Sequence, residues 1–143
     1  MDKSELLEQT RQSELLRLFD IEIETAEKDF VVLTMPVTPK VHQYIGIMNG
    51  GVSLLLAETA ASIGAVVSYD LGKVTPVGIE INANHLRAVS RGLLRVEAKS
   101  IYNGRTLSVW SVEITNERGK LVCISRITLS LKKGPAFPAA DAE

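Results

Sequence analysis

The spacing of apolar and polar residues changes along the chain, and each change predicts a different kind of element. Residues 4–19 have apolar side chains at helical spacing, and Ser4 is suited to cap the start of that helix. Over residues 21–35 the period falls to two, which predicts a pair of strands joined by a charged turn. Pro36 and Pro39 are expected to end the second strand and to begin a loop.

A long apolar run over residues 50–69 predicts a helix without a polar face, which must be buried on most of its sides. Alternation then returns, and Asn103-Gly104 indicates a hairpin with a turn of the primed type. Trp110 lies in one of the later strands and is expected in the core. The predicted later strands cover residues 77–84, 94–100, 106–115 and 121–131.

This order of elements predicts an α+β fold in which a curved antiparallel sheet wraps around one long central helix. One sheet cannot hide every side of such a helix, so we expect a second subunit to cover the rest. Residues 1–133 are expected to form a single domain with an N-terminal helix. Residues 134–143 carry two prolines and small residues, and are expected to form a flexible tail.

Composition and charge narrow the class of protein. The chain has 143 residues, 45% of them hydrophobic, which is enough for a core and excludes a disordered chain. One cysteine and two histidines exclude an intramolecular disulfide and argue against a zinc site, and a net charge of -1 argues against nucleic-acid binding. Residues 1–72 hold five basic and eleven acidic residues, whereas residues 73–143 hold eleven and six. An anionic ligand is therefore expected on the second half.

The apolar run over residues 50–69 also raises the question of a membrane span. Glu58 falls near its centre, hydroxyl side chains interrupt it, and no basic cluster flanks it closely. The charged N-terminus lacks the apolar core of a signal peptide. We therefore expect a buried helix in a cytoplasmic protein that does not contact a membrane.

Glu58 is the candidate for chemistry, because with His42 set aside it is the only acidic or basic residue between Lys40 and Asp70. A carboxylate inside an apolar helix loses hydration, which costs several kcal/mol unless it is compensated. Such a residue usually marks a functional site. The alternative is a structural ion pair with an arginine of the sheet, either Arg87 or Arg126.

Two further features of the long helix fit a catalytic site. Ser62 lies one turn beyond Glu58 on the same face, where it can bond the carboxylate, a water, or its own helix backbone. Gly50 and Gly51 begin the helix, and free amides at a helix start can hold a developing oxyanion. Gly50 and Glu58 are about 12 Å apart along the helix axis, so the amide and the carboxylate of one chain are too far apart to act on the same carbonyl group. A site shared between two subunits removes this difficulty.

Five segments occur in a characteristic order along the chain. They are His42-Gln43-Tyr44-Ile45-Gly46-Ile47-Met48-Asn49-Gly50-Gly51, Leu55-Leu56-Ala57-Glu58-Thr59-Ala60-Ala61-Ser62, Gly78-Ile79-Glu80-Ile81-Asn82-Ala83-Asn84-His85-Leu86-Arg87, Asn103-Gly104-Arg105-Thr106 and Ser125-Arg126. Together they resemble the hotdog-fold acyl-CoA thioesterases over residues 15–131. The similarity is to the 4-hydroxybenzoyl-CoA and phenylacetic-acid-degradation branch, which includes the 1,4-dihydroxy-2-naphthoyl-CoA hydrolases.

The resemblance implies hydrolysis of an aromatic or otherwise bulky acyl-CoA. Glu58 would be the nucleophile or general base, Gln43 and the Gly50 amide would polarise the thioester carbonyl, and Ser62 would position the water. Asn49 stands where the family commonly has histidine, and asparagine can donate a hydrogen bond but cannot transfer a proton. The residues expected to contact substrate or the CoA arm are Gly78, His85, Leu86, Arg87, Ala88, Tyr102, Asn103, Gly104, Arg105, Thr106 and Leu107.

The same resemblance implies no metal and no cofactor, since CoA is part of the substrate. It also implies a homo-oligomer, either a dimer or a dimer of dimers (a homotetramer), with the active site at the subunit interface. Two alternatives remain at this stage. One is a hydroxyacyl thioester dehydratase of the same fold, although such enzymes use a histidine and the long helix has none. The other is a non-catalytic acyl-CoA-binding module, which would not need Glu58.

Overall fold

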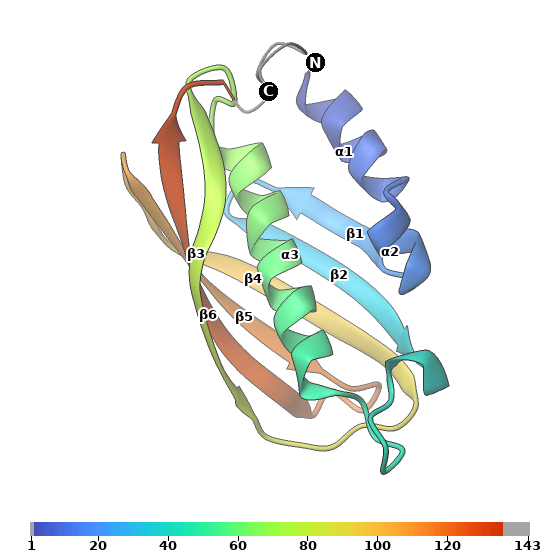
Figure 1. Ribbon diagram of the computed structural model, residues 1–143. Coiled ribbons are helices and arrows are strands. Elements are labelled where there is room, and N and C mark those ends of the chain that lie inside the picture. The colour runs from blue at the N-terminus through green and yellow to red at the C-terminus, as the bar shows by residue number, and fades with distance from the viewer. Residues whose placement is uncertain (1, 136–143) are drawn as a thin grey trace.

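The structure, a computed structural model, describes residues 2–135 and is one sheet folded around one long helix (Figure 1). Six strands and three α-helices make up this part of the chain, with one 3-10 turn before the long helix. The elements are α1 (Lys3–Arg11), α2 (Glu14–Leu18), β1 (Glu22–Glu27), β2 (Phe30–Val37), η1 (Pro39–Val41), α3 (Gly50–Ser68), β3 (Val74–His85), β4 (Gly92–Asn103), β5 (Leu107–Thr115) and β6 (Leu121–Lys133).

All neighbouring strands are antiparallel, in the order β1-β2-β4-β5-β6-β3. The sheet curves, with α3 on one face and with α1 and α2 beside α3 on the β1 side (Figure 1). This arrangement is the predicted hotdog fold. β1 and β3 are the edge strands, and β3, with twelve residues, is the longer of the two.

The core lies between α3 and the sheet. On the helix, Leu56, Ala60 and Ile63 are among the residues buried on the side that faces the strands. Trp110 is fully buried, as predicted, and its ring packs so closely on Gly64 that a methyl group there would lie 2.3 Å from the ring. The other side of α3 remains partly or fully exposed, so a single sheet does not cover the apolar helix.

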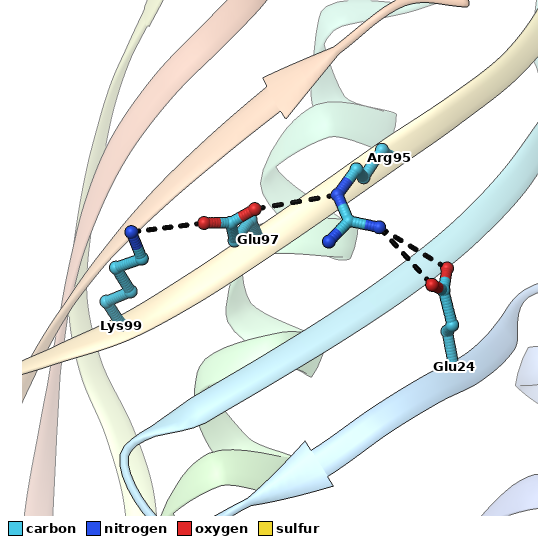
Figure 2. Close-up of polar contacts among 4 residues, drawn as sticks. All are labelled: Glu24, Arg95, Glu97 and Lys99. Atoms are coloured by element: carbon cyan, nitrogen blue, oxygen red, sulfur yellow. Dashed lines mark hydrogen bonds and ion pairs between the residues drawn. The ribbon is translucent and has the colours of Figure 1, made fainter.

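The face of the sheet away from α3 carries charge. Arg95 of β4 lies 3.3 Å from Glu24 of β1 and 3.5 Å from Glu97, whose other oxygen is 3.1 Å from Lys99 (Figure 2). Val96 alternates with Arg95 and Glu97 along the strand and is buried, so β4 has one apolar and one charged face. These exposed pairs contribute little to stability individually, and their main effect is to keep this surface polar.

Three sequence predictions about local structure are wrong. The N-terminal helix is two helices, because Asp2 rather than Ser4 caps α1 and Ser13 interrupts the run by capping α2. β2 continues through Pro36 to Val37. Its pairing with β1 extends only as far as Thr34, so at Pro36 the strand has one neighbour and needs no second ladder bond. A hairpin does join β4 and β5 at Asn103, but neither Asn103 nor Gly104 has a positive φ, which excludes a type I′ turn.

The sheet order also differs from the hairpin sequence expected for the later strands. β3 does not pair with β4, which follows it in the chain, but with β6. The segment that connects β3 to β4 passes the start of α3, where Val89 O accepts a hydrogen bond from Met48 N. This connection leaves β3 at the edge, beside α3.

Two further expectations concern a membrane span and the C-terminal tail. By length and composition α3 could span a membrane, yet 44% of this apolar stretch is buried in the fold, where it forms part of the core. The predicted tail begins at Gly134, but residues 136–143 lie outside the described part of the chain.

Candidate active site

The start of α3 is fixed by Asn49. Its side-chain oxygen accepts a hydrogen bond from Gly51 N at 2.8 Å, and its own N–H donates to Val41 O at 2.9 Å. Asn49 is thus the N-cap of the helix, a position that asparagine favours. As the first helical residue, Gly50 has an N–H with no partner inside the helix. That amide is the group that can receive a negative oxygen.

Glycine at position 50 permits a close approach by His85. An added Cβ would lie 3.0 Å from His85 Nε2 and 3.1 Å from Cε1, tighter than ordinary contact. His85 is the last residue of β3, so the end of the edge strand meets the start of the central helix. The two residues line a cavity of about 340 Å³.

This first cavity gathers most of one group of predicted site residues. Gln43 lines it, and the Gln43 side-chain oxygen accepts from Ile45 N at 2.6 Å, which orients the amide and leaves its NH2 group as a donor. The predicted segment 85–88 forms the opposite wall, together with apolar residues of neighbouring elements. Asn49 does not line the cavity, because its side-chain oxygen is turned toward the helix backbone. The arrangement offers two uncharged donors beside a histidine and an arginine.

Glu58 lies elsewhere, on the outward side of α3. We expected it to be held away from solvent, and for one chain this is wrong: the residue is exposed, because α3 turns its other side to the sheet. Its carboxylate packs on the backbone of β3, since a Cβ on Gly78 would lie only 2.2 Å from Glu58 Oε1. Within residues 2–135 it forms no ion pair with Arg87 or Arg126, so the structural alternative finds no support.

A second cavity, of about 270 Å³, contains Glu58. Ser62 lines it one helical turn away, as the spacing predicted, and α1 supplies the facing wall. Leu7 and Thr10 of α1 were missed by the sequence analysis. These two residues are three apart and share one face of α1, but nothing in the sequence shows that this face lies against α3.

The two cavities have no lining residue in common. Gly50 and Glu58 are eight residues apart on one straight helix, about 12 Å at 1.5 Å per residue. The oxyanion donors and the carboxylate of one chain therefore do not act on the same carbonyl group, as the sequence spacing indicated.

The predicted segment 102–107 lies at the far end of α3. Tyr69, which follows the helix, brings its hydroxyl to 3.3 Å from Asn103 Oδ1 and 3.1 Å from Gly104 O. Burial raises the pKa of Tyr69, and Asn103 also bonds Asp29 in the β1–β2 turn. Because α3 is about 28 Å long, segments 85–88 and 102–107 of one chain do not share a cavity. Among residues 2–135 no cluster of three His, Cys, Asp or Glu side chains is placed to hold a metal ion.

Comparison with known proteins identifies the family of the chain. The Thioesterase superfamily model matches residues 45–123. A 1,4-dihydroxy-2-naphthoyl-CoA hydrolase of Listeria monocytogenes is 48% identical over 113 residues, which are 79% of this chain and 91% of the relative. The protein of that name from Escherichia coli is 37% identical over 129 residues, or 89% and 93% of the two chains.

Solved structures give the same result. A thioesterase from Haemophilus influenzae superimposes with a TM-score of 0.83 at 38% identity, over 94% of this chain and 92% of that one. A hypothetical thioesterase from Streptococcus pneumoniae, solved with coenzyme A, superimposes with a TM-score of 0.73 at 27% identity, over 80% and 90%. The chain therefore belongs to the thioesterase superfamily.

Within that family its activity is hydrolysis of acyl-CoA thioesters.

Proposed function

We propose that the chain hydrolyses an aromatic acyl-CoA, with 1,4-dihydroxy-2-naphthoyl-CoA as the first candidate, at a site built from two copies of the chain. Two relatives carry the name of that hydrolase, and Leu7, Ile63 and Val66 give the cavity beside Glu58 an apolar part. The observation that carries the proposal is the separation of Glu58 from the Gly50 and Gln43 donors. Each chain holds both halves of a site, in places where they cannot meet.

The edge strand β3 is the surface on which a second copy would complete the site. Its outer edge is unpaired over twelve residues, and Ile79 there is 58% exposed. A long unpaired edge with apolar side chains is a template for another strand. The opposite edge is less open, because β1 is short, contains an irregularity between Ile23 and Thr25, and binds Arg11.

The contacts of β3 with α3 indicate how the copies would pair. The helix start touches His85 at the end of the strand, while Glu58 touches Gly78 nearer its beginning. Antiparallel pairing of two β3 strands around a two-fold axis near Asn82 would bring Gly78 level with His85 of the partner subunit. The Glu58 carboxylate of one copy would then face the Gly50 amide of the other.

This pairing would also bring together the two segments expected to bind CoA, residues 85–88 of one copy and residues 102–107 of the other. The hairpin containing Arg105 adjoins the beginning of β3, because Thr106 O accepts from Leu131 N and Leu131 pairs with Pro76. An antiparallel partner brings that end of its strand toward Arg87. Both arginines are exposed and neither forms an ion pair within residues 2–135, so they are available for the phosphates of CoA.

In the proposed reaction, the Gly50 N–H and the Gln43 side-chain amide stabilise the oxyanion that forms from the thioester carbonyl. Glu58 then acts in one of two ways. As a nucleophile, its oxygen bonds the carbonyl carbon, the C–S bond breaks, CoA leaves as thiolate, and water hydrolyses the mixed anhydride. As a general base, it takes a proton from a water that Ser62 positions, and the water oxygen bonds the carbonyl carbon instead. The C–S bond then breaks, and CoA leaves as the thiol with the proton that Glu58 took up. Neither route uses a metal or a cofactor.

A screen for thiol release tests the proposed substrate. Acetyl, hexanoyl, phenylacetyl, hydroxybenzoyl and 1,4-dihydroxy-2-naphthoyl thioesters of CoA are compared by kcat/KM, and the highest value is expected for an aryl group. Glu58→Gln should lower kcat at least about 100-fold, the range of a lost general base or nucleophile. Glu113→Gln is the matched control, because Glu113 is an exposed carboxylate on β5 that lines neither the cavity of Gly50 nor that of Glu58. Full activity of Glu58→Gln would refute the assignment.

A further inference from the structure

Helix α1 contributes little to the core. None of its residues is buried, and Leu7 is the α1 side chain that packs, partly buried, against the core cluster. A nine-residue helix is marginal by itself in water. Its position over α3 therefore needs an explanation other than the burial of apolar surface.

Polar contacts at both ends hold α1 in place. Lys3 Nζ donates to Val67 O at the C-terminal end of α3, at 2.8 Å, where the helix dipole favours a cation. Arg11 Nη1 donates to Ile23 O of β1 at 2.5 Å. These two contacts hold α1 beside α3, on the β1 side (Figure 1). The result is a wall, because Leu7 and Thr10 face the cavity that contains Glu58.

The wall of this cavity that α3 forms, opposite α1, changes from polar to apolar side chains along the helix. Glu58, Ser62 and Val66 are spaced by four residues, so they form one stripe about 12 Å long. The carboxylate lies at one end, and Ile63 and Val66 lie toward the other, opposite α1. Within this cavity, the apolar space open to an acyl group held at Glu58 lies toward Ile63, Val66 and Leu7.

We infer that α1 closes the acyl subsite and that Leu7 selects the acyl group by size, an inference that rests on the proposed role of Glu58. A short acyl group stays near Glu58 and Ser62 and does not reach Leu7. A ring system or a longer chain fills the space up to α1 and packs on the Leu7 side chain. Leu7 is thus a specificity-determining residue that takes no part in the bond changes.

The test compares acyl groups of different size in variants of one position. Leu7→Trp fills the subsite and Leu7→Ala enlarges it, while Leu6→Trp and Leu6→Ala make the same changes at a half-buried neighbour that does not line the cavity. The measured quantity is the ratio of kcat/KM for 1,4-dihydroxy-2-naphthoyl-CoA to that for acetyl-CoA. Leu7→Trp should lower the ratio at least about 10-fold, within the range for one apolar pocket contact. Leu7→Ala should change it at least about 3-fold, and the Leu6 variants should leave it unchanged.

The failure of this inference and of the proposed substrate are distinguishable. If the wild-type chain hydrolyses no aryl thioester, the proposed aromatic substrate is wrong, and the same ratio is taken for hexanoyl-CoA against acetyl-CoA. If both Leu7 variants are folded by circular dichroism and keep the wild-type ratio, α1 does not form the acyl subsite. Equal effects of the Leu6 and Leu7 variants would also overturn the inference, since they would show a general effect of α1 on the fold.

Discussion

Gly78 is where the smallest possible change should displace the proposed catalytic carboxylate. An alanine Cβ there would lie 2.2 Å from Glu58 Oε1, 3.2 Å from Cδ and 3.6 Å from Cγ, whereas ordinary contacts begin at 3.4 Å. The carboxylate oxygen must therefore retreat by about 1.2 Å. A misplacement of about 1 Å in a reacting group can cost about 100-fold in rate. We expect Gly78→Ala to lower kcat by that order.

Stability should change little in the same variant. Gly78 does not have a positive φ, so alanine adopts its backbone conformation without strain. The atom that it meets is the end of a flexible, exposed side chain, and the expected change in unfolding free energy is within about 0.5 kcal/mol.

The assay is steady-state thiol release, combined with urea unfolding of the same samples. Gly72→Ala is the matched control, because it adds the same methyl group in the exposed turn after α3, next to Asp70 rather than Glu58. An unchanged kcat in Gly78→Ala, with a folded protein, would refute the view that the observed position of the Glu58 carboxylate is the reactive one.

Three further predictions follow from the packing and the proposed pairing. Gly64→Ala should destabilise the fold by about 1–3 kcal/mol in urea unfolding, because the new methyl group would lie 2.3 Å from the buried Trp110 ring; equal stability to wild type would contradict the packing. Cys123 should react with a disulfide reagent only after unfolding, since burial raises the pKa of its thiol. If the native protein rapidly releases the reagent's thiol at pH 8, this prediction is wrong. Asn82→Cys should form an intersubunit disulfide on oxidation while Thr75→Cys does not, and the reverse result would move the axis away from Asn82.

The extent of α3 and of the later strands was predictable because local periodicity determines them. The helix expected over residues 50–69 is Gly50–Ser68, and the predicted hairpin strands end within a few residues of β4, β5 and β6. The wrong N-cap at Ser4 has a local cause, since Asp2 forms a capping box with Glu5 and so caps the same helix two residues earlier.

The sheet order was not predictable in the same way. A period of two shows which side chains share a face of a strand, but it does not show which strand becomes its neighbour. The placement of β3 beside β6 decides the geometry of the site, because it leaves β3 at the edge and puts Gly78 under Glu58.

The exposure of Glu58 has a related cause. An apolar helix indicates that both sides need cover, but nothing in its sequence shows which side faces its own sheet. The sequence therefore shows that the carboxylate is isolated in an apolar run, while its burial in one chain was predicted wrongly. The role of α1 at the cavity could only be inferred once Leu7 was seen against α3.

The central claim, that one site needs two chains, is tested most directly by mixing two inactive variants. In Glu58→Gln one half of the site is damaged, and in Gln43→Ala the other half is damaged. If the halves come from different chains, each hybrid dimer has one intact site and one site with both defects. Equal mixing then restores about a quarter of wild-type activity, since half of the dimers are hybrids. If mixtures shown by native mass spectrometry to contain hybrids are no more active than the separate variants, the shared site is contradicted.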